Sequence, residues 1–335
     1  MAPNILPFHK GEKTPADPNH HSKSRPMSFL SNRMRNEVVA TAAEFAGTFM
    51  FLFFAFGATQ VANTAAVVSN GQAGESQETH SITQAPNTNV LLFISLAFGF
   101  SLATNVWVFF RVSGGMFNPA VTLGLYLIGA INGLRAVLCF FAQMFAGMAS
   151  AGVVSAILPG ELNVSTSLGA GTSIAQGVFL EMFLTAQLVF TIFMLAAEKH
   201  KATFLAPIGI GLSLFVAEMM GVFYTGGSLN PARSFGPAAV VHFFPGYHWI
   251  YWLGPFMGTL LAFGMYKLIK TVEYQTVNPG QDFDDHEAEL FHPPDDPENA
   301  DQVARPNVAA IAAEEAVRAA SSSPERTRSS VQDTL

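Results

Sequence analysis

Long apolar stretches, separated by short polar connections, fill the chain between residues 36 and 271. Six of them contain roughly the 20 apolar residues that an α-helix needs to cross the hydrocarbon core of a bilayer. The predicted spans are residues 38–61, 90–110, 134–158, 174–196, 204–224 and 249–269. The pattern therefore predicts an all-α membrane protein with six transmembrane helices.

Two shorter apolar segments, residues 119–127 and 231–241, lie between these spans. Each follows a Gly-rich run and begins with Asn-Pro-Ala, in which Asn is a good helix N-cap and Pro fits the first helical position. Both segments are too short to cross the bilayer. Non-helical backbone at membrane depth is tolerated only where it is buried in protein or lines a watery cavity. We therefore expect two re-entrant half-helices that line a pore or a midplane binding site.

The two halves of this region, residues 36–158 and 174–271, repeat each other. Each half contains one Asn-Pro-Ala motif and one intramembrane Glu with a Phe one or two residues after it. The repeated residues are Glu44, Asn118, Pro119 and Ala120 in the first half, and Glu181, Asn230, Pro231 and Ala232 in the second. Three spans per half is an odd number, so the halves have opposite orientations, which is the inverted repeat of many transport proteins. The half-helix N-termini are then expected to meet near the midplane.

The composition agrees with a membrane protein that has polar ends. Of the 335 residues, 50% are hydrophobic and only 12% are charged, about half the charge of a soluble domain. Residues 1–35 and 272–335 are polar, and we expect them to form cytosolic tails, the second largely disordered. The net charge of −7 comes largely from the C-terminal tail. We expect no nucleic acid as a partner.

Candidate catalytic chemistry is scarce in the apolar region. Cys139 is the only cysteine, which excludes a disulfide framework and a thiolate metal site. The apolar region shows no nucleophile–base pair, phosphate-binding loop or cluster of metal ligands. We therefore expect no enzyme activity, no cofactor and no metal.

The distribution of Lys and Arg predicts the orientation. Residues 1–35 contain six of them, and Arg111 and Arg135 flank the first half-helix, whereas the connections at 62–89 and 159–173 contain none. By the positive-inside rule, both termini are cytosolic. Asn163 begins an N-glycosylation sequon, Asn-Val-Ser, in a connection that this orientation places outside.

At this point several motifs together resemble one family. They are Ala43-Glu44-Phe45, Ser113 to Thr122, Tyr224 to Gly236, and His248 to Pro255. Two Asn-Pro-Ala motifs in matched contexts, with Arg after the second, are similar to those of the aquaporins. The resemblance covers residues 36–275 and is greatest to the fungal members. It implies a water channel, a homotetramer with one pore per subunit, and two constrictions. We expect the protein to lie in the plasma membrane.

A narrow water pore must replace the hydrogen bonds that water loses, each worth about 1–3 kcal/mol when left unmade. Candidate acceptors on one wall are the carbonyls of Gly115, Met116, Phe117, Gly227, Ser228 and Leu229. The amides of Asn118 and Asn230 are expected to donate to one water oxygen, which interrupts a proton wire. The half-helix N-termini each place roughly half a positive charge there. Together with Arg233 they oppose protons and cations.

Alignment with the family's water-specific members implies a second constriction, a selectivity filter. Its residues are Phe98, Glu218, Gly227 and Arg233. Glu218 stands where those members have a histidine. Either its carboxylate points into the pore and changes the selectivity, or it turns aside and fixes Arg233. Ser234 stands where the glycerol-conducting branch has Asp, which favours water, with hydrogen peroxide as a plausible second permeant.

Glu44 and Glu181 are intramembrane carboxylates and therefore functional candidates. One interpretation is a proton relay, which would make the protein a proton-coupled transporter that uses Glu44, Glu181 or Glu218. The other is that each carboxylate accepts backbone N–H groups of the Gly-rich segment before a half-helix, which we call a broken segment, and holds this segment in place. The matched repeat positions favour the second interpretation. A glycerol facilitator and a non-conducting scaffold of the same fold remain further alternatives.

Overall fold

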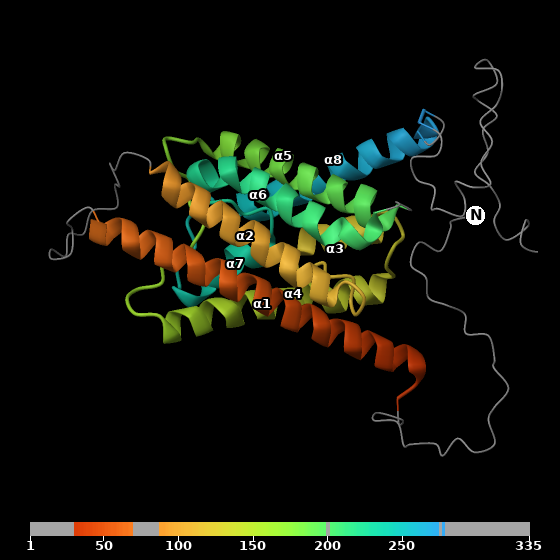
Figure 1. Cartoon of the computed structure of the whole chain (residues 1–335), viewed down its shortest axis with the longest axis horizontal. Helices are drawn as coiled ribbons and strands as arrows, with labels where there is room; N and C mark the ends of the chain where they lie inside the picture. The colour runs from red at the N-terminus through yellow and green to blue at the C-terminus, as the bar shows by residue number, and fades with distance from the viewer. Residues whose placement is uncertain (1–29, 70–86, 199–201, 275–276, 279–335) are drawn as a thin grey trace, which may run out of the picture. The chain divides into compact units, whose positions relative to one another are not determined.

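The computed structural model describes residues 30–69, 87–198, 202–274 and 277–278 (Figure 1). The chain divides into two units, Met1–Val272 and Glu273–Leu335. The following description concerns the first unit. Most of the two predicted tails lies outside the described residues.

Within the described residues, the first unit is built from six long helices and two short ones. The long helices are α1 (Asn32–Ser69), α2 (Thr88–Phe109), α4 (Gly133–Ile157), α5 (Ile174–Ile192), α6 (Ala206–Thr225) and α8 (Ile250–Thr271), and the short ones are α3 (Pro119–Leu127) and α7 (Pro231–Val240). Every predicted span and half-helix is present, so the predicted fold class is confirmed. The main differences lie at the ends of helices. α1 begins inside the predicted tail and continues to Ser69, and α5 closes with a π-helical turn, Phe193–Ala197.

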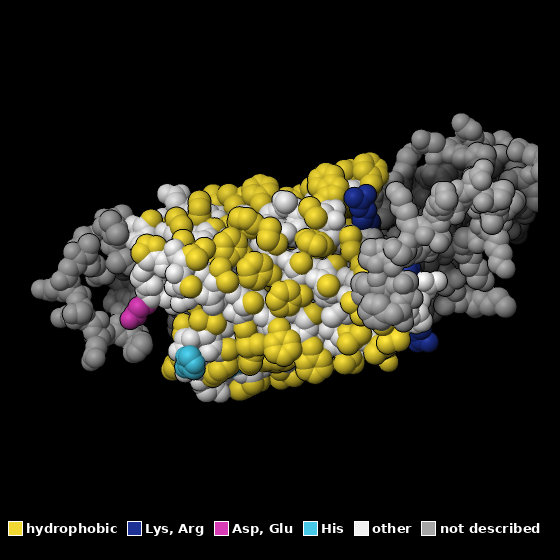
Figure 2. All heavy atoms as spheres, turned by 90° about the horizontal axis from the view of Figure 1, so that it is seen from below, with side chains coloured by type: hydrophobic (Ala, Val, Ile, Leu, Met, Phe, Trp, Pro, Cys, Tyr) yellow, Lys and Arg dark blue, Asp and Glu magenta, His cyan; other side chains and the backbone are white. Residues whose placement is uncertain are grey.

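The long helices have the length and composition of membrane spans. Five of them, from α1 to α6, are long and apolar enough to cross a bilayer, and α8 has 22 residues and packs along α5. Hydrophobic side chains cover most of the described surface in Figure 2, while Lys and Arg lie at one end. The protein is therefore an integral membrane protein.

The packing of the helices is that of an inverted repeat. α1 packs on α4 and α2 as α5 packs on α8 and α6, and α4 contacts α7 as α8 contacts α3. We call the end where α1 begins and α8 ends the tail end, on the right of Figure 1, and the opposite end the loop end. The ion pair of Arg135 with Glu37 lies at the tail end, and Gln60 donates to the carbonyl of Glu161 at the loop end.

The two halves join where α2 crosses α6. Gly99 and Gly211 occupy equivalent positions on these helices and face each other. A Cβ atom on Gly211 would lie 2.6 Å from the carbonyl oxygen of Gly99 and 2.5 Å from the Cβ of Ala103. Small residues let the two backbones approach closely, as is common between membrane helices. This close approach fixes the distance between the two halves.

We predict that Gly211→Ala lowers the free energy of unfolding by about 1–3 kcal/mol, because the added methyl group meets a backbone atom that cannot move aside. The measurement is the thermal unfolding midpoint of the purified protein in detergent. The control is Gly264→Ala in α8, where a Cβ meets nothing within 4 Å, and where we expect no loss of stability. Equal losses in the two variants would contradict the tight crossing.

Candidate functional site

The Gly-rich segments before the two half-helices have the same unusual backbone. Gly115 has φ of +64° and Phe117 of +51°, while Gly227 has +62° and Leu229 +51°. Left-handed backbone costs little for glycine but is uncommon for a bulky residue. Because the same strain recurs at matched positions, both segments must be held in place by their surroundings.

Glu44 and Glu181 supply that support, one for each segment. Glu44 is fully buried and accepts hydrogen bonds from the N–H groups of Met116 (3.0 Å) and Phe117 (2.9 Å). The Ser113 hydroxyl (2.6 Å) and the Gln143 amide (2.9 Å) also donate to it. All four donors satisfy a carboxylate that would otherwise be very costly to bury.

Glu181 makes the corresponding contacts in the second half. It is fully buried and accepts from the N–H groups of Ser228 (3.0 Å) and Leu229 (2.7 Å) and from the Thr225 hydroxyl (2.6 Å). Thr225 is the repeat equivalent of Ser113. In both halves the carboxylate is occupied by the broken segment, which favours the interpretation of an anchor over that of a proton relay.

The two Asn side chains cap their half-helices and also join them. Asn118 accepts from the N–H of Ala120 (2.8 Å), and Asn230 from that of Ala232 (2.9 Å). The Asn118 amide donates to the Leu229 carbonyl at 2.8 Å, and the Asn230 amide donates to the Phe117 carbonyl at 2.9 Å. The half-helix N-termini therefore meet, as the inverted repeat predicts.

This cross-linking changes the expected donor and acceptor pattern. The Phe117 and Leu229 carbonyls, which the sequence assigns to the pore wall, already accept one bond each. A carbonyl has two lone pairs and an amide two N–H groups. One N–H on each Asn therefore remains for a permeant, and each of these two carbonyls retains one acceptor site.

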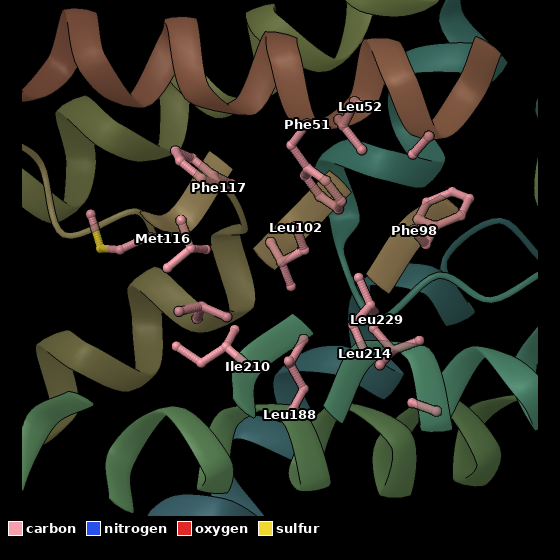
Figure 3. Close-up of a cluster of buried hydrophobic side chains, with 14 of the residues drawn as sticks. Phe51, Leu52, Phe98, Leu102, Met116, Phe117, Leu188, Ile210, Leu214 and Leu229 are labelled. Carbon is pink, nitrogen blue, oxygen red and sulfur yellow. The ribbon is translucent and has the colours of Figure 1, made fainter. Parts of the chain in front are cut away.

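A narrow cavity runs past the Asn side chains. It has a volume of about 20 Å³, enough for roughly one or two water molecules. Polar groups of the broken segments line the cavity together with apolar side chains, among them Leu188, Ile210 and Leu214, which are drawn in Figure 3. A second cavity of about 50 Å³ continues toward the tail end and shares Met116 and Ile210 with the first.

Arg233 lines the loop-end part of this cavity and is held rigidly. Its guanidinium donates to the carbonyls of Gly227 (2.9 Å), Val164 (2.6 Å) and Gly226 (3.3 Å). The guanidinium carbon lies 4.9 Å from the centre of the Phe98 ring and 5.4 Å from that of Phe56, within the range of cation–π attraction. Three of its five N–H groups are thus used by backbone, and two are left.

Glu218 lines the same cavity but does not bind Arg233. Its side chain is only 1% exposed, and neither carboxyl oxygen has a hydrogen-bond partner among the described residues. Its Oε2 atom fills the place that a Cβ on Gly227 would take, 1.7 Å from that position. Of the two sequence interpretations, the geometry favours the one in which Glu218 faces the pore. Arg233 is fixed by carbonyls instead.

The structure brings together the predicted motif, filter and anchor residues, but other contributors have no clear signal in the sequence. Phe56 and Val164 hold Arg233, and Gln143 supports Glu44. Ser113 and Thr225 were identifiable in principle, because both are hydroxyl residues at equivalent positions before Gly-Gly. Asn163 lies apart from the cavity, exposed at the loop end, and its use as a glycosylation site stays a prediction.

Two inverted repeats whose half-helices meet beside a narrow cavity define the class of membrane channels with re-entrant half-helices. The family model described as "Major intrinsic protein" matches residues 31–266. The chain therefore belongs to the major intrinsic protein family, whose aquaporins are membrane channels and not enzymes.

Several fungal aquaporins are similar to this chain, as the resemblance predicts. Aquaporin-7 of Botryotinia fuckeliana (strain B05.10) is 60% identical over 253 residues, 76% of this chain and 54% of that protein. "Probable aquaporin-3" of Gibberella zeae is 49% identical over 282 residues, 79% of this chain and 95% of that protein. The match spans only about half the length of Aquaporin-7, and 46% of Aquaporin-5 from the same Botryotinia strain.

A solved structure shares the fold. The aquaglyceroporin from Plasmodium falciparum superposes with a TM-score of 0.56 over 71% of this chain and 97% of that one. The sequence identity is 20%, so this likeness concerns the fold alone.

We predict that Glu44→Gln and Glu181→Gln each reduce the free energy of unfolding by about 1–3 kcal/mol. The amide would point a donor at backbone N–H groups that need an acceptor. Thermal unfolding in detergent measures the loss, and the repeat predicts similar values for the two variants. Glu161→Gln, at an exposed position of the loop end, is the matched control and should not change the midpoint. An unchanged midpoint for Glu44→Gln would argue against the anchor.

Proposed function

We propose that this protein is a passive channel that conducts water and excludes protons and ions. The observation that supports the proposal is the meeting of the two half-helix N-termini beside a narrow cavity, with one free amide N–H on each of Asn118 and Asn230. A water that accepts from both amides points its own hydrogens away from the midplane. Such a water cannot take part in a continuous proton wire.

Exclusion of cations follows from the charges around the cavity. Each half-helix N-terminus contributes roughly half a positive charge, and both point at the midplane. Arg233 adds a full charge toward the loop end. A proton or cation would meet these charges without its hydration shell, which raises an electrostatic barrier.

The lining of the cavity supports water as the permeant. The apolar side chains of Leu188, Ile210 and Leu214 offer no hydrogen bond, so a permeant is bound by the polar groups only and leaves easily. We propose hydrogen peroxide as a second permeant, because its size and polarity are close to those of water. A glycerol facilitator is the alternative of a related class. A proton-coupled transporter is disfavoured because Glu44 and Glu181 already accept several bonds each.

The assembly and location are also proposals. The family resemblance supports a homotetramer in which each chain has its own pore, surrounded by lipid. We propose the plasma membrane as its location, with the tail end and both termini in the cytosol. The support is the absence of Lys and Arg from residues 159–173 and their presence at the tail end in Figure 2.

The sharpest test of conduction compares two tryptophan variants of α6. We predict that Ile210→Trp, whose side chain lines both cavities, reduces water permeability to near that of empty vesicles. Leu212→Trp, on the exposed face of the same helix at 51% exposure, should conduct as the unmodified chain does. The measurement is light scattering by proteoliposomes after an osmotic step, without a pH gradient.

The same vesicles distinguish the alternatives. Fast water flux with slow glycerol entry supports a water channel, whereas rapid glycerol entry supports the facilitator. Flux that requires a pH gradient would indicate a coupled transporter. If vesicles that contain the unmodified protein changed volume no faster than empty vesicles, the proposed water conduction would be wrong.

The orientation can be tested with single introduced cysteines, because Cys139 is fully buried and gives a low background. We predict that a membrane-impermeant maleimide added to intact cells labels Glu161→Cys at the loop end but not Arg111→Cys at the tail end. Both positions are exposed, and both variants should label after permeabilisation. The reverse pattern in intact cells would place the termini outside.

A further inference from the structure

Glu218 differs from the other two buried carboxylates of the pore region. Glu44 and Glu181 accept several hydrogen bonds each, whereas both oxygens of Glu218 lack a partner among the described residues. The cavity is where a partner for these oxygens can come from, since Glu218 is part of its wall. A buried carboxyl group without protein donors is costly to keep ionised.

The first half of the repeat has apolar residues where the second half has Glu218 and Arg233. The position equivalent to Glu218 in the first half is Val106, which packs on Gly115 as Glu218 packs on Gly227. The position equivalent to Arg233 is Val121, which also lines the cavity. An apolar pair at one end of the pore is thus replaced by an acid and a base at the other.

The acid and the base face the same lumen without touching. Arg233 is held by three carbonyls, and no ion pair with Glu218 occurs among the described residues. Glu181, the other charged group that acts on Glu218, already accepts hydrogen bonds from the broken segment. From α2, the apolar Phe98 faces this part of the cavity.

A water between the two groups is held differently in the two protonation states. With Glu218 ionised, the water accepts from Arg233 and donates to a carboxylate, so both bonds are charge-assisted and about twice as strong as neutral ones. With Glu218 protonated, one of these bonds becomes neutral. Fast conduction needs a site that binds weakly enough for the permeant to leave.

We propose that Glu218 is a proton-binding site of the filter, and that its protonation converts a pore that holds water tightly between Glu218 and Arg233 into one that conducts faster. The proton comes from a hydronium ion in the water at the loop-end mouth of the cavity and does not cross the midplane. An O–H bond forms at a carboxylate oxygen, one O–H bond of the hydronium breaks, and a neutral water remains. This inference rests on the proposed water conduction.

The test measures osmotic water permeability of proteoliposomes containing the full chain, at a series of equal internal and external pH values from about 4 to about 9, a range that brackets carboxyl titration. We expect the permeability of the unmodified protein to rise by roughly three- to tenfold as the pH falls. Glu218→Gln and Glu218→Val should both be independent of pH, because neither side chain titrates. The valine variant copies the packing of Val106 in the first half.

A variant of His248 tests whether another titratable group at the loop end causes the pH dependence. It lies just before α8, and burial lowers the pKa of its imidazole. His248→Gln should keep the full pH dependence. Loss of the pH dependence in His248→Gln, or its persistence in Glu218→Gln, would overturn the assignment to Glu218.

The unmodified protein alone already decides part of the question. If its water permeability exceeds that of empty vesicles but is the same at every pH, the inference fails while the proposed channel function stands. If it conducts no water at any pH, both fail.

Discussion

A peptide group that breaks from its helix inside a membrane must find another partner, because each unpaired group costs several kcal/mol there. In the two broken segments of this protein, buried carboxylates are the partners of the backbone N–H groups. Glu44 and Glu181 each accept two consecutive N–H groups and a hydroxyl. The positions of the half-helices, the turn carbonyls and Arg233 all depend on these two anchors.

The anchors also explain why the site lies between the repeats. Each carboxylate belongs to the first helix of its own half, so each broken segment is completed inside that half. The amide groups of Asn118 and Asn230 are not used within their own halves. Each donates a hydrogen bond to a carbonyl of the broken segment in the other half. The close crossing at Gly99 and Gly211 sets how near the halves come. The cavity is the space that this docking leaves.

Much of this architecture could be predicted from sequence, because its signals are local. The apolar run lengths indicate the spans, and Asn followed by Pro indicates where α3 and α7 begin. α1 continues past the predicted end at residue 61 because residues 62–66 contain no stop signal. The binding of Arg233 to the Val164 carbonyl depends on a connection far away in the chain, and the Asn cross-links depend on how two halves dock. No local pattern encodes either.

The repeat also limits where selectivity can arise. Backbone shape is nearly the same in the two turns, with matched left-handed residues at Gly115 and Gly227, so the turns by themselves give a symmetric passage. Side chains at equivalent positions make the two ends differ. Replacing valine by Glu218 and Arg233 at the loop end changes the electrostatics of the lumen while leaving the turns and their anchors intact. A carboxyl group there is tolerated because Gly227 has no side chain, which ties the chemistry of the loop end of the cavity to the smallest residue of the turn.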